Sequence, residues 1–177
     1  MKRCFIAIDI SGEARAVIAE HAAALKREFR DIRVSWTKPE NLHVTLKFLG
    51  DVDDQTVGRV AERLCDLPAF DPVQLTLSKT RSFGKRVLAV AVNDPNGRLG
   101  ALQDSVEQMC AKLGFERDKR AFRPHITTAR IRDQKSVNAL IEANRTSAIE
   151  PVEFVVESVV LYESKLGPGG SVYTKIA

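Results

Sequence analysis

The chain has 177 residues, of which 44% are hydrophobic and 28% are charged, and its formal net charge is +4. This length suits one domain, or two small lobes that share a core. No apolar run approaches the ~18 residues of a membrane span. The apolar part of the N-terminal "MKRCFIAIDI" is also too short for the core of a signal peptide. We therefore expect a cytoplasmic protein, and the mildly basic balance is compatible with an anionic partner such as RNA.

The predicted elements of the first half alternate between strands and helices. Residues 4–10 are predicted to form a strand, and residues 11–29 a helix that Ser11 can cap. The next strand lies in "NLHVTLKFLG" (41–50), where apolar residues that should face the core alternate with others. The apolar set is Leu42, Val44, Leu46 and Phe48. A helix over 54–66 and strands over 72–83 and 86–94 follow, the strands joined by a turn at Gly84–Lys85.

The second half repeats this order of elements. It contains a helix over 98–114, a strand with His125, a helix at about 134–145, a strand over 152–164 and, after the glycine-rich "GPGG" turn, a last strand in "SVYTKIA". Equivalent points lie at near-constant offsets: 83 residues from Phe5 to Leu88, 82 from His43 to His125 and 79 from Val73 to Val152. We therefore predict two structural copies of a strand–helix–strand–helix–strand unit within one bilobal domain over residues 1–177.

Two H-x-T triplets occupy matching places in these copies. Residues i and i+2 of a strand share a face, so His43 lies beside Thr45, and His125 beside Thr127. If the two strands meet at the centre, two imidazoles face one cleft. A neutral imidazole can then take a proton from attacking water while an imidazolium protonates a leaving oxygen at phosphorus. The hydroxyls can hold non-bridging oxygens, so this chemistry needs no metal or cofactor.

Other interpretations of these residues are weaker. A lone strand histidine is usually structural, but two in matching triplets favour catalysis. A metal site would need carboxylates or a third histidine nearby, and Asp51, Asp53 and Asp133 do not lie at a compact ligand spacing. No serine or cysteine stands beside either histidine, and His21 is expected on a helix surface. The three scattered cysteines form no CxxC and are expected in the core.

The motifs "HVTL" (43–46) and "HITT" (125–128) resemble those of the two-histidine (2H) phosphoesterase superfamily. The flanks in "WTKPENLHVTLKFLG" (36–50), "FRPHITTAR" (122–130) and "ESKL" (163–166) resemble its RNA 2′,3′-cyclic phosphodiesterase branch, historically called 2′-5′ RNA ligases. The resemblance spans nearly the whole chain. It implies an α+β bilobal, duplicated fold with two antiparallel sheets, outer helices and a central cleft.

The resemblance also implies an activity. RNA 2′,3′-cyclic phosphate ends would be opened to 2′-phosphomonoesters, with His43 as proton donor and His125 as proton acceptor. Thr45 and Thr127 would orient the phosphate. Spacing alone does not say which histidine is the acid. The roles exchange in the reverse direction, which would allow 2′-5′ RNA ligation as a side activity.

Several neighbours are candidates for substrate binding. Lys47 and Arg123 share the histidine faces by parity, although Lys47 could equally be a solvated strand lysine. Arg130 is five residues from His125, so only a bulge or the strand's end would turn it into the site, where the resemblance places it. Phe83 and Tyr173 could stack on a base or ribose, or could belong to the core.

Two other functions remain alternatives. A non-catalytic module that binds RNA ends would use the same cleft without turnover. An RNA ligase proper would need a nucleotidylation lysine motif that is missing here. We expect a monomer without an obligate protein partner, acting on RNA ends such as tRNA fragments, or on cyclic nucleotides.

Overall fold

The computed structural model describes residues 1–132, 137–168 and 170–177. Their helices are α1 (Gly12–Glu28), α2 (Asp54–Cys65), α3 (Arg98–Lys112), α4 (Asn138–Thr146) and the short 3₁₀-helix η1 (Pro39–Asn41). Their strands are β1 (Lys2–Asp9), β2 (Val34–Trp36), β3 (His43–Val52), β4 (Val73–Phe83), β5 (Val87–Asn93), β6 (His125–Ile131), β7 (Glu153–Val156), β8 (Val160–Gly167) and β9 (Gly170–Lys175). None of these helices is long and apolar enough to cross a membrane.

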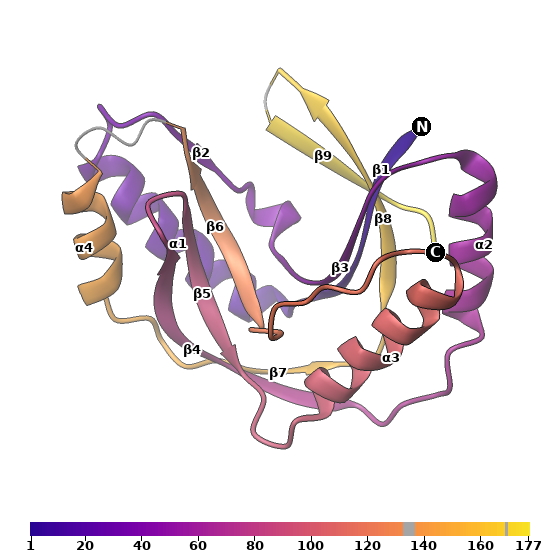
Figure 1. The fold of residues 1–177 in the computed structure, drawn as a ribbon. Coiled ribbons are helices and arrows are strands. Elements are labelled where there is room, and N and C mark those ends of the chain that lie inside the picture. The colour runs from indigo at the N-terminus through magenta and orange to yellow at the C-terminus, as the bar shows by residue number, and fades with distance from the viewer. Residues whose placement is uncertain (133–136, 169) are drawn as a thin grey trace.

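The strands form one curled antiparallel sheet in the order β7-β4-β5-β6-β3-β1-β8-β9, with β2 paired to β6. Figure 1 shows the sheet bent into an open half-barrel, with β4, β5 and β6 in one wall and β1, β3 and β8 in the other. The two expected sheets are joined at the centre by a single residue pair, Val44 with Ile126. The predicted α+β class with antiparallel strands and a central opening is confirmed.

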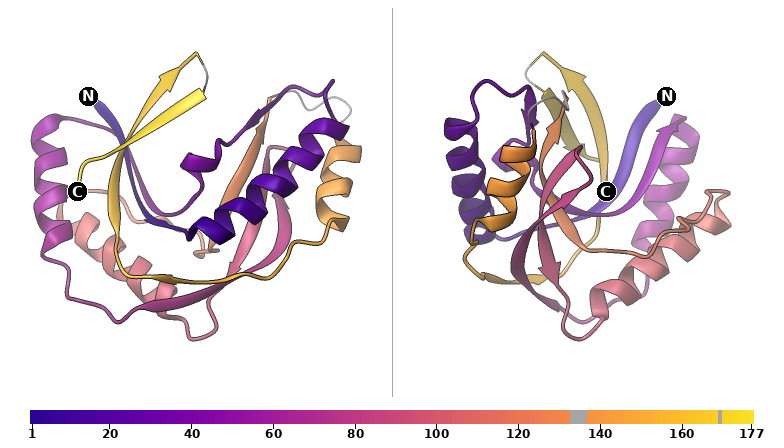
Figure 2. Two further views of the ribbon diagram at one scale, coloured as in Figure 1. Left: turned by 180° about the vertical axis from the view of Figure 1, so that it is seen from behind. Right: turned by 60° about the vertical axis from the view of Figure 1, so that its left-hand side comes forward.

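The four helices lie on the outside of the curled sheet. Helices α2 and α3 pack on each other and on β1 and β3, while α1 and α4 pack against β6 and β4 (Figure 2). Ser11 caps α1 as predicted, because its Oγ accepts a hydrogen bond from the Ala14 amide at 3.1 Å. Each helix buries its apolar stripe against the convex side of the sheet, which leaves the concave side for polar groups.

The predicted strand over 152–164 is wrong in one respect, because the structure divides it into β7 and β8. Strand β7 pairs with β4 at one end of the sheet, and β8 pairs with β1 at the other end. Figure 1 shows the chain crossing beneath the opening between them. Residues 157–159 belong to neither strand. Apolar alternation continues through this segment, so the sequence pattern did not show the break.

Smaller differences concern element ends and the cysteines. The sequence did not predict β2 or η1. The helix expected from 134 begins at Asn138, and residues 134–136 lie outside the described residues, as does Gly169 of the predicted glycine-rich turn. Cys4 and Cys110 are in the core as expected, but Cys65 ends α2 and is exposed.

Candidate active site

His43 and His125 are the first residues of β3 and β6, the two strands that meet at the centre of the sheet. The next residues, Val44 and Ile126, are paired and fully buried, so they face the core. Because the strands are antiparallel, the residues on either side of this pair also lie opposite each other, His43 opposite Thr127 and Thr45 opposite His125. The structure therefore brings the two predicted triplets to adjoining positions on the concave side.

Both imidazoles are held by the same backbone contact. The Nδ1–H of His43 donates to the carbonyl oxygen of Asn41 at 2.7 Å, and that of His125 donates to the carbonyl of Arg123 at 2.7 Å. A carbonyl only accepts, so each contact places a proton on Nδ1 and leaves Nε2 to exchange protons. His43 Nε2 lies 2.9 Å from Thr45 Oγ1. The two histidines thus present the same ring atom to the concave side.

A β-bulge follows each triplet at its fourth position. In β3, Thr45 is opposite Ala7 and Lys47 is opposite Ile6, which leaves Leu46 without an opposed residue. In β6, Thr127 is opposite Ala89 and Ala129 is opposite Leu88, which leaves Thr128 without one. Both extra residues are buried. Because a bulge shifts the alternation by one residue, the fourth residue after each histidine turns to the core and the fifth turns to the site.

The bulge in β3 overturns two expectations from strand parity. Lys47 does not share the face of His43. It is 7% exposed, and its Nζ lies 2.8 Å from Glu107 Oε2 beneath α3. Phe48, expected in the core, is 63% exposed, and it lies opposite Phe5, whose ring stacks on His43. Lys47 is therefore a buried structural cation, and Phe48 takes its expected place beside the site.

The bulge in β6 turns Arg130 toward the histidines. Arg130 is exposed, and its charge acts on the pKa of both His43 and His125. The bulge that this placement required is present at Thr128. Arg130 and Phe48 are therefore corresponding residues, each five positions after a histidine.

Aromatic rings surround His43. Phe5 stacks on the imidazole at a centroid distance of 4.8 Å, and Tyr173 of β9 approaches it edge-on at 5.5 Å. Phe5 also contacts Phe48 at 6.2 Å. Tyr173, one of the predicted candidates, therefore lies at the site, and Phe5 and Phe48 are aromatic neighbours that sequence reasoning missed.

A pocket of about 480 Å³ adjoins His125. It is lined by Phe83 and Arg123, both predicted candidates, together with Arg81 and Phe122. The Phe83 ring lies 4.6 Å from the imidazole of His125, centroid to centroid. The site therefore has an aromatic wall beside each histidine and arginines on the His125 side.

The remaining histidine lies outside this group, and the described residues form no metal site. His21 on α1 is half-buried rather than on the surface, because its Nε2 contacts Oδ1 of the fully buried Asn144 at 3.1 Å. Across residues 1–132, 137–168 and 170–177, no three His, Cys, Asp or Glu side chains are grouped as metal ligands are.

A family model described as the 2′-5′ RNA ligase superfamily matches residues 15–168. The chain belongs to this superfamily. An RNA 2′,3′-cyclic phosphodiesterase of Archaeoglobus fulgidus is 31% identical over 97% of the chain and 96% of its own length. One of Thermotoga maritima is 31% identical over 97% of the chain and 91% of its own length. The crystal structure of Escherichia coli LigT complexed with 3′-AMP has a TM-score of 0.77 at 26% identity, covering 99% of this chain and 95% of that one.

The electrostatics of this 2′-5′ RNA ligase superfamily site lower the pKa of both histidines. Burial is the main cause for each, and the hydrogen bond to the backbone carbonyl partly opposes it by raising the pKa. Arg130 lowers the pKa of both, while Arg81 acts on His125 and Arg15 on His43. Both imidazoles therefore give up a proton more readily than an exposed histidine.

One carboxylate distinguishes the two histidines of the superfamily site. Asp9 of β1 lies opposite His43 and raises its pKa, whereas none of the carboxylates in residues 1–132, 137–168 and 170–177 acts on that of His125. Burial would raise the pKa of Asp9, but hydrogen bonds from Lys175 and Tyr162 outweigh it and keep that pKa below its ordinary value. Asp9 is therefore an anion that favours the protonated form of His43.

Proposed function

We infer that the chain is an enzyme that hydrolyses the 2′,3′-cyclic phosphate ends of RNA. The observation that carries this function is the pair of H-x-T triplets, which adjoin across the centre of the sheet, with each Nδ1 held by a backbone carbonyl so that Nε2 is the atom that exchanges protons. The printed names of the relatives in Archaeoglobus fulgidus and Thermotoga maritima support the same activity.

In the proposed reaction, water attacks the cyclic phosphorus as the bond to the 3′-oxygen breaks. His125 Nε2 takes a proton from the water, and protonated His43 gives its Nε2 proton to the departing 3′-oxygen. The product is an RNA end with a 2′-phosphomonoester and a free 3′-hydroxyl. By microscopic reversibility, the same groups with exchanged roles could join RNA ends in the 2′-5′ sense.

The charges around the histidines support this assignment of roles. The family resemblance makes His43 the acid, and Asp9 favours its protonated form. Arginines lower the pKa of both histidines, Arg81 and Arg130 that of His125 and Arg15 and Arg130 that of His43. Asp9 is therefore the charge that supports different roles for the two histidines. The negative charge of a bound phosphate raises the pKa of a neighbouring imidazole, so substrate binding helps His43 to hold its proton.

The other polar groups support binding of the phosphate and its nucleoside. The Thr45 and Thr127 hydroxyls and the Arg130 guanidinium would hold the non-bridging oxygens and stabilise the charge that develops on them. The pocket of Arg81, Phe83 and Arg123 beside His125 offers an aromatic ring and two cations to a nucleoside.

Product analysis tests the proposed function. The protein is incubated with an RNA that ends in a 2′,3′-cyclic phosphate, in excess EDTA, and products are identified by phosphorus NMR. We expect a 2′-phosphomonoester to accumulate in EDTA at the same rate as without it. A 3′-phosphate product or loss of turnover in EDTA would contradict the mechanism. Recovery of tightly bound, unchanged RNA would instead favour the non-catalytic RNA-end binding module.

We also propose that the exposed ring of Phe48 stacks on a base of the substrate. The ring is 63% exposed and continues the aromatic surface of Phe5 and Tyr173 beside His43. Stacking of a base on an aromatic side chain is worth ≈ 1–3 kcal/mol.

Phe48→Ala is therefore expected to raise the KM for cyclic-phosphate RNA about tenfold, while Phe48→Trp keeps it near the wild-type value. Initial rates over a range of RNA concentrations give the KM and kcat of each variant. Val155→Ala is the matched control, because Val155 is also an exposed apolar residue, at 54%, but lies on β7 at the end of the sheet. An unchanged KM in Phe48→Ala would refute the stacking contact.

A further inference from the structure

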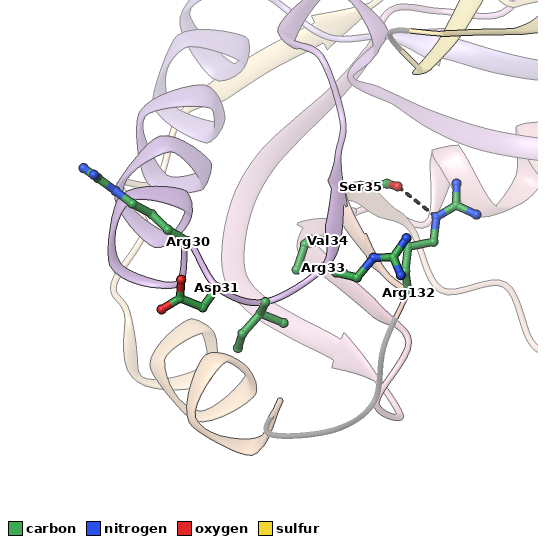
Figure 3. A pocket seen from close by; sticks show the side chains of 7 residues that line it. Arg30, Asp31, Arg33, Val34, Ser35 and Arg132 are labelled. Carbon is green, nitrogen blue, oxygen red and sulfur yellow. Dashed lines mark hydrogen bonds between the residues drawn. The ribbon is translucent and has the colours of Figure 1, made fainter.

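A second basic pocket lies at the far end of β6 from His125. Its volume is about 740 Å³, and it is lined by residues 30–35 and by Arg132 (Figure 3). Three of these residues are arginines, and one, Asp31, is acidic. The function described above leaves this pocket unused.

The pocket continues the face of the sheet that carries the histidines. Ser35 of β2 is paired opposite Arg130, so the two side chains share a face. Arg132 follows two residues later, and its Nε donates to Ser35 Oγ at 2.9 Å. Arg130 and Arg132 are therefore successive cations on the concave side, extending from the active site into the pocket.

A second guanidinium lies beside that of Arg132. The amide of Arg132 donates to the carbonyl of Arg33 at 3.0 Å, which holds the two residues next to each other. Figure 3 shows the side chains of Arg33 and Arg132 side by side, whereas Arg30 points away on the other side of Asp31. Two planar cations in this arrangement suit one phosphate group, which guanidinium binds through paired hydrogen bonds.

We propose that Arg33 and Arg132 bind a backbone phosphate of the RNA, upstream of the cyclic end that occupies the active site. Arg132 lies seven residues after His125. At the rise of a strand this separation is roughly 20 Å, too far for a single nucleotide and within reach of an RNA chain. This binding site rests on the proposed function, and it makes RNA chains better substrates than cyclic mononucleotides.

A comparison of two substrates tests the proposal. Wild-type protein, Arg33→Ala, Arg132→Ala and the double variant are assayed with a short oligouridylate ending in a 2′,3′-cyclic phosphate, and with 2′,3′-cyclic UMP. For the oligonucleotide, we expect the double variant to raise KM roughly tenfold at low salt and to reduce the slope of log KM against log salt by about 0.7. For cyclic UMP, the kcat and KM of the double variant should both stay at wild-type values.

Arg30→Ala is the matched control, because Arg30 lines the same pocket but points away from the pair. It should behave as wild type on both substrates. An unchanged oligonucleotide KM in the double variant would overturn the proposal, and so would an equal loss on cyclic UMP. Anisotropy titration with an oligouridylate that ends in a 2′-phosphate reports binding without turnover. It therefore tests the arginines even if the proposed hydrolysis is not observed.

Discussion

His43→Ala and His125→Ala should each lower kcat for hydrolysis of cyclic-phosphate RNA ends by at least ~10²-fold, with the protein still folded. Each substitution removes one of the two groups that move protons in the proposed step. Because the two groups act on one transition state, the kcat of the double variant should be little lower than that of the slower single variant. Initial rates with cyclic-phosphate RNA, together with a thermal unfolding curve for each variant, give both quantities.

His21 provides the matched control for these substitutions, since it is the one other histidine of the sequence. Its ring contacts Asn144 on the outer side of the sheet, so His21→Ala should leave kcat near the wild-type value when assayed well below its unfolding temperature. Added imidazole should partly restore the rate of His125→Ala, because a free base can replace the missing side chain. If either active-site variant kept more than about a tenth of wild-type kcat, two-histidine catalysis would be wrong.

Lys47→Met should destabilise the fold by about 3–5 kcal/mol and leave the chemistry intact. The Lys47 and Glu107 side chains are 7% and 5% exposed, and their 2.8 Å contact is supported by a bond from Lys47 Nζ to the Glu116 carbonyl at 2.6 Å. Removing the lysine leaves a carboxylate buried without its counter-charge. The free energy of unfolding is obtained from urea titrations of wild-type and variant protein.

Two further variants show whether the loss of stability in Lys47→Met comes from the burial of an unpaired charge. The double substitution Lys47→Met with Glu107→Leu removes both charges and should recover most of the lost stability. Lys2→Met breaks the exposed ion pair with Asp54 and should cost no more than about 1 kcal/mol. The kcat and KM of Lys47→Met, measured well below its unfolding temperature, should match wild type. A raised KM of this variant for cyclic-phosphate RNA would instead indicate that Lys47 binds substrate.

The two histidine–threonine pairs were predictable because they depend only on short-range alternation. His43 with Thr45 and His125 with Thr127 lie before the bulges, where strand parity holds. Beyond the bulges the same rule placed Lys47 in the cleft and Phe48 in the core, and both placements are wrong. A bulge depends on how a strand pairs with its neighbour, which one strand's sequence does not show.

The division between β7 and β8 has the same origin. The apolar pattern of residues 152–164 fits one long strand, and only pairing with β4 and β1 at opposite ends of the sheet separates the halves. Fold class and element order follow from periodicity and spacing, whereas sheet order follows from contacts between distant segments. That the two halves are copies of one unit stays a prediction, supported by the corresponding places of β3 and β6 at the centre of the sheet.

The crossing of the chain from β7 to β8 has a consequence for folding. Strand β1 lies between β3 and β8, so β1 lacks one neighbour until residues 160–167 have been made. On the other side, β4 pairs with both β5 and β7, the latter also from the last quarter of the chain. Neither wall of the half-barrel can be completed from an N-terminal fragment. Folding must therefore close long loops, and it should be slow.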